Sequence, residues 1–397
     1  MIEITDKSQC CGCTACASVC PKMCIAMKED EEGFLYPEAD ASLCIGCGLC
    51  ENVCPVLHQG DARKPLAVYA AKNRDENVRM ASSSGGIFSL LAERVIDDGG
   101  VAFGARFDDN WEVIHDFAET KEKLVAFRGS KYVQSCMESC FVQAKRFLDG
   151  GRKVLFTGTS CQIAGLKNYL RKDYENLLAV DVVCHGVPSP EAWRKYLKEI
   201  SASQGGENSA LLCGNYAERK IQKINFRSKS TGWKKYSFAL AFTGASTKGE
   251  QNAVLISHKF TEDPYMKVFL SNISLRPSCY SCPSKAGKSQ SDITIADFWG
   301  INRVMSEFDD DKGVSLVLVY SEKGMQFCKS LHWDKKVADY SDGLKSNMCL
   351  EKSVAMHINR AYFFRKLSKG FNTAYMAVME NSKYRRFRRF LFRKMGI

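Results

Sequence analysis

The sequence predicts a small α+β module at the N-terminus, then an α/β domain with a mostly parallel sheet and a β-rich insertion, and a helical basic tail. Three observations lead to this prediction. Ten of the 19 cysteines fall in the first 54 residues, apolar strands beginning at Lys153 and Leu177 each run into a loop and a helix, and residues 383–397 hold seven Lys or Arg and no acid. Strands that alternate with helices are typical of parallel α/β units. The expected segments are 1–58 for the module, 66–149 and 150–345 for the two parts of the α/β body, and 346–397 for the tail.

The N-terminal module is built on a repeated run of cysteines. The spacing C-x2-C-x2-C-x3-C-P occurs twice, and each position in the second run lies 34 residues after its counterpart. This spacing is typical of bacterial two-cluster ferredoxins, in which the fourth cysteine of each run binds the other cluster. Zinc sites pair C-x2-C knuckles across a longer spacer, so zinc fits less well. The predicted ligands are Cys10, Cys13, Cys16 and Cys54 for one 4Fe–4S cluster and Cys44, Cys47, Cys50 and Cys20 for the other, while Cys11 and Cys24 are expected to be packing residues.

Composition and charge limit the class of protein. Hydrophobic residues make up 45% of the chain and charged residues 25%, which are ordinary globular values. The N-terminus has no apolar signal-peptide core, and no apolar run approaches the roughly 18 residues of a membrane span. Because thiols and clusters persist in reducing compartments, we expect a cytoplasmic protein. Residues 383–397 carry most of the formal charge of +11 and leave +4 for the rest, so nucleic acid is not an expected partner.

The basic tail has a helical apolar face. Tyr384, Phe387 and Leu391 share one side of a helix, and arginines occupy the remainder. A basic amphipathic helix of this kind is able to lie on an anionic membrane surface. Docking on the protein's own body, binding an acidic partner subunit and a frayed terminus are the alternatives.

A serine- and glycine-rich loop precedes the first predicted helix of the α/β body. Residues 68–72 form an expected strand, residues 82–86 read SSSGG, and apolar residues recur at helical spacing from Ile87. The free N–H groups and the dipole of a helix N-terminus favour phosphate. A plain N-cap with a flexible turn is the alternative.

Four further cysteines stand near predicted strand ends or in a short motif. Cys161 follows the strand from Lys153, and Cys184 follows the strand from Leu177. Open parallel sheets place their sites at the carboxyl ends of strands. Cys279 and Cys282 form a C-x2-C-P motif, which by itself also fits half a zinc site or a loop pair. It supplies a second pair to Cys161 and Cys184. The four predict a third 4Fe–4S site, for which His185 is a competing ligand.

The remaining stretches complete the expected body. Residues 101–117 read as two strands around a turn, a helix is expected from about 135 to 148, and residues 205–260 read as an antiparallel insertion. A short helix at 263–270, strands at 292–296 and 314–320 and a helix at 322–331 follow. Cys136 and Cys140 stand four residues apart and are expected to pack in the core.

The order of these motifs resembles the coenzyme F420 hydrogenase/dehydrogenase beta-subunit family over roughly residues 5–320. The motifs are the two ferredoxin-type runs, SSGG, SKYVQS, GTSCQIAGLK, VCHGVPSP, C-x2-C-P and SDITIADFWG. The family usually has proline where this chain has Ser160, which loosens the turn but keeps the thiolate of Cys161. The resemblance implies a cluster on Cys161, Cys184, Cys279 and Cys282. It also implies FAD nearby, for which the candidate contacts are Ser83, Ser84, Gly85, Gly86, Lys131, Thr157, Gly158, Thr159, Gln162 and His185.

The predicted function is electron transfer between clusters and, through FAD, a hydride-carrying acceptor or small-molecule substrate, with a redox partner protein. The flavin carries the hydride chemistry, so no acid–base catalyst is expected. Lys131 is a candidate to stabilise the reduced ring, and a solvated surface lysine is the alternative. Two other functions remain open: a reductase with its own small substrate, and a flavin-free, polyferredoxin-like electron wire within a larger redox complex.

Overall fold

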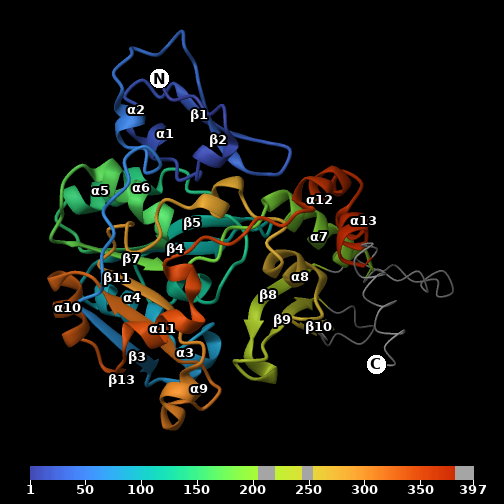
Figure 1. Ribbon diagram of the computed structural model, residues 1–397. Helices are drawn as coiled ribbons and strands as arrows, with labels where there is room; N and C mark the ends of the chain where they lie inside the picture. Colours follow the sequence, from blue (N-terminus) through green and yellow to red (C-terminus); the bar gives the residue numbers. More distant parts are fainter. Residues whose placement is uncertain (204–219, 244–253, 381–397) are drawn as a thin grey trace.

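The computed structural model describes residues 1–203, 220–243 and 254–380. Figure 1 shows the N-terminal module in blue above the central body, next to α5 and α6. Its antiparallel hairpin covers the cysteine loops and turns at Gly33, whose φ is +84°. The elements of the module are η1 (Lys7–Gln9), α1 (Ala15–Val19), β1 (Ile25–Glu29), β2 (Leu35–Ala39) and α2 (Leu49–Asn52).

The central body is organised around one eight-stranded sheet. Its spatial order is β13 (Trp333–Val337), β3 (Ala67–Asn73), β12 (Ser315–Val319), β11 (Ile293–Asp297), β7 (Leu177–Val182), β6 (Val154–Thr159), β4 (Val101–Phe107) and β5 (Val113–Ala118). The segments 66–149 and 150–345 therefore build the same sheet.

The prediction of a mostly parallel sheet is correct only for the centre. The pairs β11–β7, β7–β6 and β6–β4 are parallel, while the pairs outside them are antiparallel. At one edge the antiparallel pairing follows from a short connection. A tight turn joins β4 to β5, whereas parallel strands need a longer crossover. The body is thus a mixed α/β domain.

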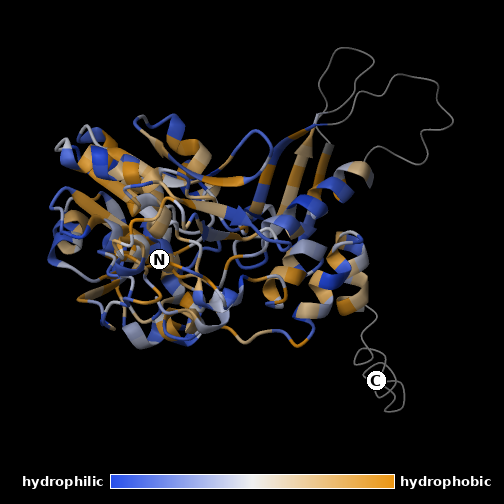
Figure 2. Cartoon of the chain, turned by 90° about the horizontal axis from the view of Figure 1, so that it is seen from above, coloured by the Kyte–Doolittle hydropathy of each residue, from blue (hydrophilic) through white to orange (hydrophobic). Residues whose placement is uncertain are grey.

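Helices cover both faces of the sheet. Successive side chains of a strand point to opposite faces, and the buried strands carry apolar residues on both. Val154 and Phe156 of β6 pack toward α5 and α6, together with residues of the N-terminal module. Leu155, between them, packs toward the opposite layer, which contains α4 and α10. Figure 2 shows hydrophobic residues concentrated along the strands, while the outer helices carry both hydrophobic and hydrophilic residues. The helices of this body are α3 (Glu76–Ala81), α4 (Ile87–Asp97), α5 (Cys140–Asp149), α6 (Ser160–Leu170), α9 (Ile301–Val304), α10 (Glu322–Lys329) and α11 (Tyr340–Ser346).

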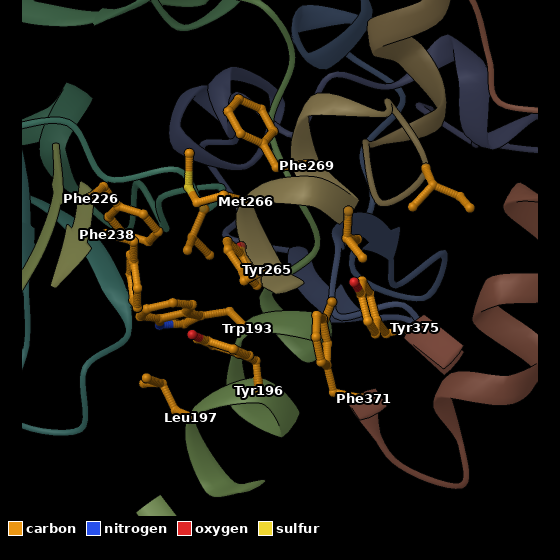
Figure 3. Packing of buried hydrophobic residues seen from close by; sticks show 14 of the residues in the cluster. Trp193, Tyr196, Leu197, Phe226, Phe238, Tyr265, Met266, Phe269, Phe371 and Tyr375 are labelled. Atoms are coloured by element: carbon orange, nitrogen blue, oxygen red, sulfur yellow. The ribbon is translucent and has the colours of Figure 1, made fainter. Parts of the chain in front are cut away.

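The predicted antiparallel insertion is present as a three-stranded sheet with its own core. Figure 3 shows the buried aromatic residues that join it to neighbouring helices. The ring of Trp193 lies 5.0 Å from the rings of both Phe226 and Tyr265. The elements are α7 (Pro190–Ser203), β8 (Ile221–Ser228), β9 (Ser237–Phe242), β10 (Val254–Lys259), α8 (Pro264–Leu270), α12 (Arg360–Leu367) and α13 (Phe371–Tyr375).

One expected helix begins later than predicted. The helix expected from about residue 135 starts at Cys140, because Cys136 pairs with the edge of the sheet instead. The Cys136 N–H donates to the Val113 carbonyl at 2.8 Å, and the Cys136 carbonyl accepts from His115. Glu138 then has a positive φ of 42°, which interrupts the backbone before the helix.

Short 3-10 and π segments link the larger elements. They are η2 (Lys123–Phe127), η4 (Lys229–Thr231), η5 (Pro277–Ser281), η6 (Ser306–Phe308), η7 (Met348–Leu350) and η8 (Met376–Glu380). The amphipathic helix predicted at 383–397 lies outside the described residues. Among the helices that the structure describes, none has the length and apolarity needed to cross a membrane.

Candidate functional site

The eight cysteines of the repeat surround two small hollows in the N-terminal module. The first hollow is lined by the inner set, Cys10, Cys13, Cys16 and Cys54, and the second by the outer set, Cys20, Cys44, Cys47 and Cys50. Each set combines three cysteines of one run with the last cysteine of the other run, which is the grouping that the repeat predicts. Two further thiols lie at the hollows, Cys11 at the first and Cys24 at the second.

The two sets differ in exposure. Cys10, Cys13 and Cys16 of the inner set are buried, whereas Cys47 of the outer set is exposed. Burial raises the pKa of the Cys16 thiol to about 12, and the neighbouring charges of Cys10 and Cys54 add to the increase. The inner set therefore faces the protein body and the outer set faces solvent.

The third set of cysteines is assembled from three separate parts of the chain. Cys161 lies in the first turn of α6, Cys184 follows β7, and Cys279 and Cys282 lie within and just after η5. The charges of Cys161, Cys279 and Cys282 all act to raise the pKa of Cys184, so the four thiols are neighbours in space. Cys279 Sγ also accepts a hydrogen bond from the Val187 N–H at 3.4 Å.

The backbone beside the third set is closely packed. Gly186 has a φ of +146°, and a Cβ at this position would lie 2.7 Å from Leu275 Cδ1 and 3.3 Å from Cys279 Cβ. Burial raises the pKa of Cys279 to about 12, while the Lys285 ammonium lowers the pKa of Cys184 against its burial. These buried thiols need cations nearby to lose their protons, which iron supplies in a cluster.

The cysteine sets are not arranged for a single ion. Within the described ranges, no group of three or more His, Cys, Asp or Glu side chains is placed to hold a metal ion. A cubane binds its four thiolates at four separate irons, so its ligands stand farther apart than those of one zinc ion. The donor chemistry, which is thiolate without carboxylate, fits iron–sulfur clusters.

The inner and third sets approach each other through α6. A Cβ built on Gly165 would lie 2.8 Å from Cys13 Sγ, so only glycine allows the module to sit this close to the helix. The Cys11 thiol interacts with both Cys13 and Cys161. Cys11 is buried in the core, as predicted for a packing residue, but it also lies between the two cysteine sets.

A buried arginine lies beside the same sets. Arg276 is fully buried, and its Nε donates to the Cys10 carbonyl at 2.7 Å. Its Nη2 donates to the Leu35 carbonyl at 2.9 Å and reaches Cys10 Sγ at 3.5 Å. Among the described residues no carboxylate forms an ion pair with it. Since buried charges are normally paired, the thiolate sulfurs are its natural counter-charge.

A cavity of about 740 Å³ adjoins the third set. Its volume falls in the range of about 300–1,000 Å³ that is usual for small-molecule and cofactor sites. Cys184 forms part of its wall. The residues predicted to contact FAD that line it are Ser83, Ser84, Gly86, Lys131, Thr157, Gly158, Thr159, Gln162 and His185.

Gly85 differs from its neighbours in the serine- and glycine-rich loop. Its N–H donates to Ser315 Oγ at 3.0 Å, and a Cβ there would lie 2.5 Å from the Ala71 carbonyl oxygen. Gly85 therefore packs against β3 and β12 and is not among the residues that line the cavity, and its role as a phosphate contact stays a prediction. Gly86 has a φ of +81° at the N-cap of α4, and Ile87 at the start of that helix lines the cavity.

One wall of the cavity is held by a polar network that the sequence did not reveal. His115 Nδ1 lies 2.8 Å from Ser135 Oγ, and its Nε2 lies 3.0 Å from the Thr157 carbonyl oxygen. Gln162 donates to Ser135 Oγ at 2.9 Å and accepts from the Thr159 N–H at 2.9 Å. Burial lowers the pKa of His115 to about 4, so its ring is neutral at physiological pH. This network fixes the loop that carries Cys161.

Two predicted contacts have specific partners inside the structure. Lys131 Nζ donates to the carbonyl oxygens of residues 127–129 at 3.2–3.3 Å, and burial lowers its pKa to about 7. Lys131 therefore lies in the wall of the cavity and is not a solvated surface lysine. His185 Nε2 lies 2.6 Å from Asn272 Oδ1, and burial lowers the pKa of His185.

Comparisons with known proteins agree with the motif order. Residues 9–57 match a model of a 4Fe–4S dicluster domain. Residues 68–141 and 151–339 match the N-terminal and C-terminal models of the coenzyme F420 hydrogenase/dehydrogenase beta subunit, and these two matches together span more than half of the chain. A search of curated proteins found no match.

The solved structures that match this chain include one hydrogenase complex. The matching chain is from a study of xenon derivatization of the F420-reducing [NiFe] hydrogenase complex from Methanosarcina barkeri. The identity is 16%, the match covers 78% of this chain and 95% of the other, and the TM-score is 0.44.

Proposed function

Because the chain belongs to the coenzyme F420 hydrogenase/dehydrogenase beta-subunit family and carries a 4Fe–4S dicluster domain, we propose that it is an iron–sulfur flavoprotein oxidoreductase. In this proposal the third set of cysteines holds a third 4Fe–4S cluster, and the cavity holds FAD. Electrons pass between a redox partner protein and a small-molecule hydride carrier.

The observation that supports this proposal most directly is the order of the cysteine sets and the cavity. The outer set faces solvent, the inner set meets α6 at Gly165, and the third set begins at Cys161 on that helix. Cys184 of the third set lines the cavity. In this order, the three proposed clusters form a continuous electron path from the protein surface to the cavity.

The residues of the cavity suit a dinucleotide that carries a flat ring. FAD, when bound, supplies the conversion between single-electron and hydride transfer. Ser83 Oγ accepts from the Ser130 N–H and keeps its own hydrogen to donate, whereas the Ser84 hydroxyl donates to the Val314 carbonyl. The first turn of α4 offers N–H groups to a pyrophosphate. Phe127, Phe260 and Trp299 give apolar walls that exclude water from a ring. Lys131 adds positive charge at or below about pH 7, which favours a reduced, anionic ring.

The partner protein is expected to approach the outer set. Cys47 is exposed, and apolar side chains at Met23, Leu43 and Ile45 are 88%, 55% and 60% exposed in the same module. Exposed apolar residues of this kind are typical of protein interaction sites. This end of the chain of cysteine sets is therefore the expected point of electron exchange with another protein.

Cofactor content after anaerobic purification tests the proposal. We expect about twelve irons per chain, four for each of three cubanes, and FAD fluorescence in an acid extract. Cys282→Ala removes about a third of the iron because it takes one ligand from the third cluster only. Cys328→Ala is the control, since Cys328 is buried in another part of the core.

Two outcomes would contradict the proposal. Absence of flavin from the wild type refutes the flavoprotein and favours the electron wire. Unchanged iron in Cys282→Ala shows that the third set is structural.

A further inference from the structure

Arg227, on β8 of the insertion, has a guanidinium that is only partly paired within the described part of the chain. It is 4% exposed and lines the cavity. Its Nη1 donates to Asp297 Oδ2, whereas Nε and Nη2 have no hydrogen-bond partner among the residues that the structure describes. Nε and Nη2 form one edge of the planar group. Buried polar groups are almost always paired, so this edge points to a bound molecule.

The surroundings hold the arginine in place. The rings of Tyr236 and Trp299 lie 4.4 and 5.0 Å from its Cζ. Trp299 stacks on Trp233 with ring centroids 4.9 Å apart and an interplanar angle of 5°. Trp233 Nε1 donates to Asp297 Oδ1 at 2.9 Å, which fixes the carboxylate that Arg227 binds. The free edge is therefore preorganised and does not have to be assembled when a ligand arrives.

We propose that the free edge of Arg227 binds an oxoanion, a carboxylate or a phosphate, on the small molecule that accepts the hydride in this cavity. An arginine edge with two parallel N–H groups matches the two oxygens of such a group. Arg227 comes from the insertion, whereas the loop expected to hold the FAD pyrophosphate comes from the start of α4. Tyr236 and Trp299 supply flat faces beside the anion site.

This inference rests on the proposed function, and it narrows the substrate to molecules that carry an oxoanion. The cofactor's own pyrophosphate has the same chemistry, so the experiment has to separate the two sources. Two probes are suitable: a fluorescent 5-deazaflavin with a phosphate-terminated side chain, and the same ring with an uncharged side chain. The two probes share the ring, and only the first has the oxoanion, so the difference between their dissociation constants reports on the anion contact.

The test compares wild-type holoprotein with Arg227→Met and Arg227→Lys. The lysine variant keeps a positive charge beside Asp297 but lacks the two-donor edge, and it guards against misfolding of the methionine variant. Arg74→Met is the control, because Arg74 is an exposed residue that pairs with Asp334. Iron content, FAD content and the dissociation constants of both probes are measured for each protein.

We expect all variants to keep iron and FAD. The preference of the wild type for the phosphate-bearing probe falls by about 10- to 100-fold in Arg227→Met, the range for hydrogen bonds to a charged group. The fall in Arg227→Lys is smaller, and Arg74→Met is unchanged.

Three results overturn the inference. The first is an equal preference for the phosphate-bearing probe in wild type and Arg227→Met. The second is loss of FAD from both Arg227 variants, which assigns the edge to the cofactor. The third is failure of the wild type to bind either probe. A wild type without FAD refutes the proposed function instead, and the probe preference then still decides the role of Arg227.

Discussion

Removing the buried arginine beside the inner set is expected to lower the reduction potential of the inner cluster. Arg276 Nη2 lies 3.5 Å from Cys10 Sγ, and its other nitrogens bond to the Cys10 carbonyl and to Gln134. A cation near a cluster stabilises the reduced form, which has one more negative charge, and hydrogen bonds to the sulfurs act in the same direction. Arg276→Met removes both effects.

The size of the shift follows from the hydrogen bond to sulfur. A hydrogen bond to a charged group contributes about 1.5–3 kcal/mol. A tenfold change in an equilibrium constant corresponds to about 1.4 kcal/mol, or to about 59 mV in the potential of a one-electron couple. The reduction potential of the inner cluster should therefore fall by about 60–130 mV. Arg276→Lys keeps the charge and should give a smaller fall. Both variants leave the Cys10 and Leu35 carbonyls without this donor, so thermal unfolding should occur at a lower temperature.

Redox titration of the holoprotein, followed by electron paramagnetic resonance, measures the shift. The outer cluster serves as an internal reference because Arg276 bonds to none of its predicted ligands. Arg194→Met is the matched control: Arg194 also joins the body to the module, but through Glu29 rather than through a thiol. If the inner cluster has the same reduction potential in Arg276→Met and in the wild type, Arg276 is not its counter-charge.

Two further predictions concern packing and protonation. A Cβ at residue 165 would lie 2.8 Å from Cys13 Sγ, well inside an ordinary contact of about 3.5–4.0 Å, so Gly165→Val should separate the module from α6 and destabilise the protein by about 1–3 kcal/mol. Thermal unfolding measures this, with Gly150→Ala as the control because its added Cβ meets nothing closer than 3.3 Å. The pKa of His115 is lowered from 6.5 to about 4, so between these pH values the unfolded state binds a proton that the folded state excludes. The free energy of unfolding should therefore fall by about 3 kcal/mol as the pH drops from above 6.5 to below 4. His115→Gln should remove this part of the acid sensitivity in denaturant titrations at several pH values; an identical pH dependence in the two proteins would contradict a neutral, buried His115.

The eight cysteines of the repeat gather around two hollows in the grouping that their spacing predicted, because spacing within a loop is a local signal. The sequence predicted the strand, loop and helix units around Cys161 and Cys184 for a similar reason, since hydrophobic runs and turn residues are local signals. It did not predict strand direction at the sheet edges, which depends on pairing between distant segments. Nor did it predict β13, because Trp333 is the only buried residue of that strand and the next four are exposed.

The residues that the sequence analysis missed share one property. His115, Arg227 and Arg276 are polar residues in strands or loops, where a solvent-facing side chain is the usual expectation. Their burial depends on neighbours that are far away in the chain, such as Cys10 for Arg276. Local pattern carries no signal for such contacts. The local pattern that placed Gly85 in a phosphate loop likewise carried no signal for the close approach of β3 and β12 to this residue.

The insertion helps to hold the cavity in shape, in addition to its proposed role in binding the acceptor. Lys229, one residue after β8, donates from Nζ to the carbonyl oxygens of Arg79, Ser84 and Lys312, each at 2.7 Å. It thereby fastens the loop that precedes α4 to the strand that carries Arg227. A loop held in this way loses little freedom when a ligand binds, so less of the binding free energy is spent on ordering it. The buried Lys229 therefore ties together the two sides of the cavity, one expected to hold FAD and the other an acceptor.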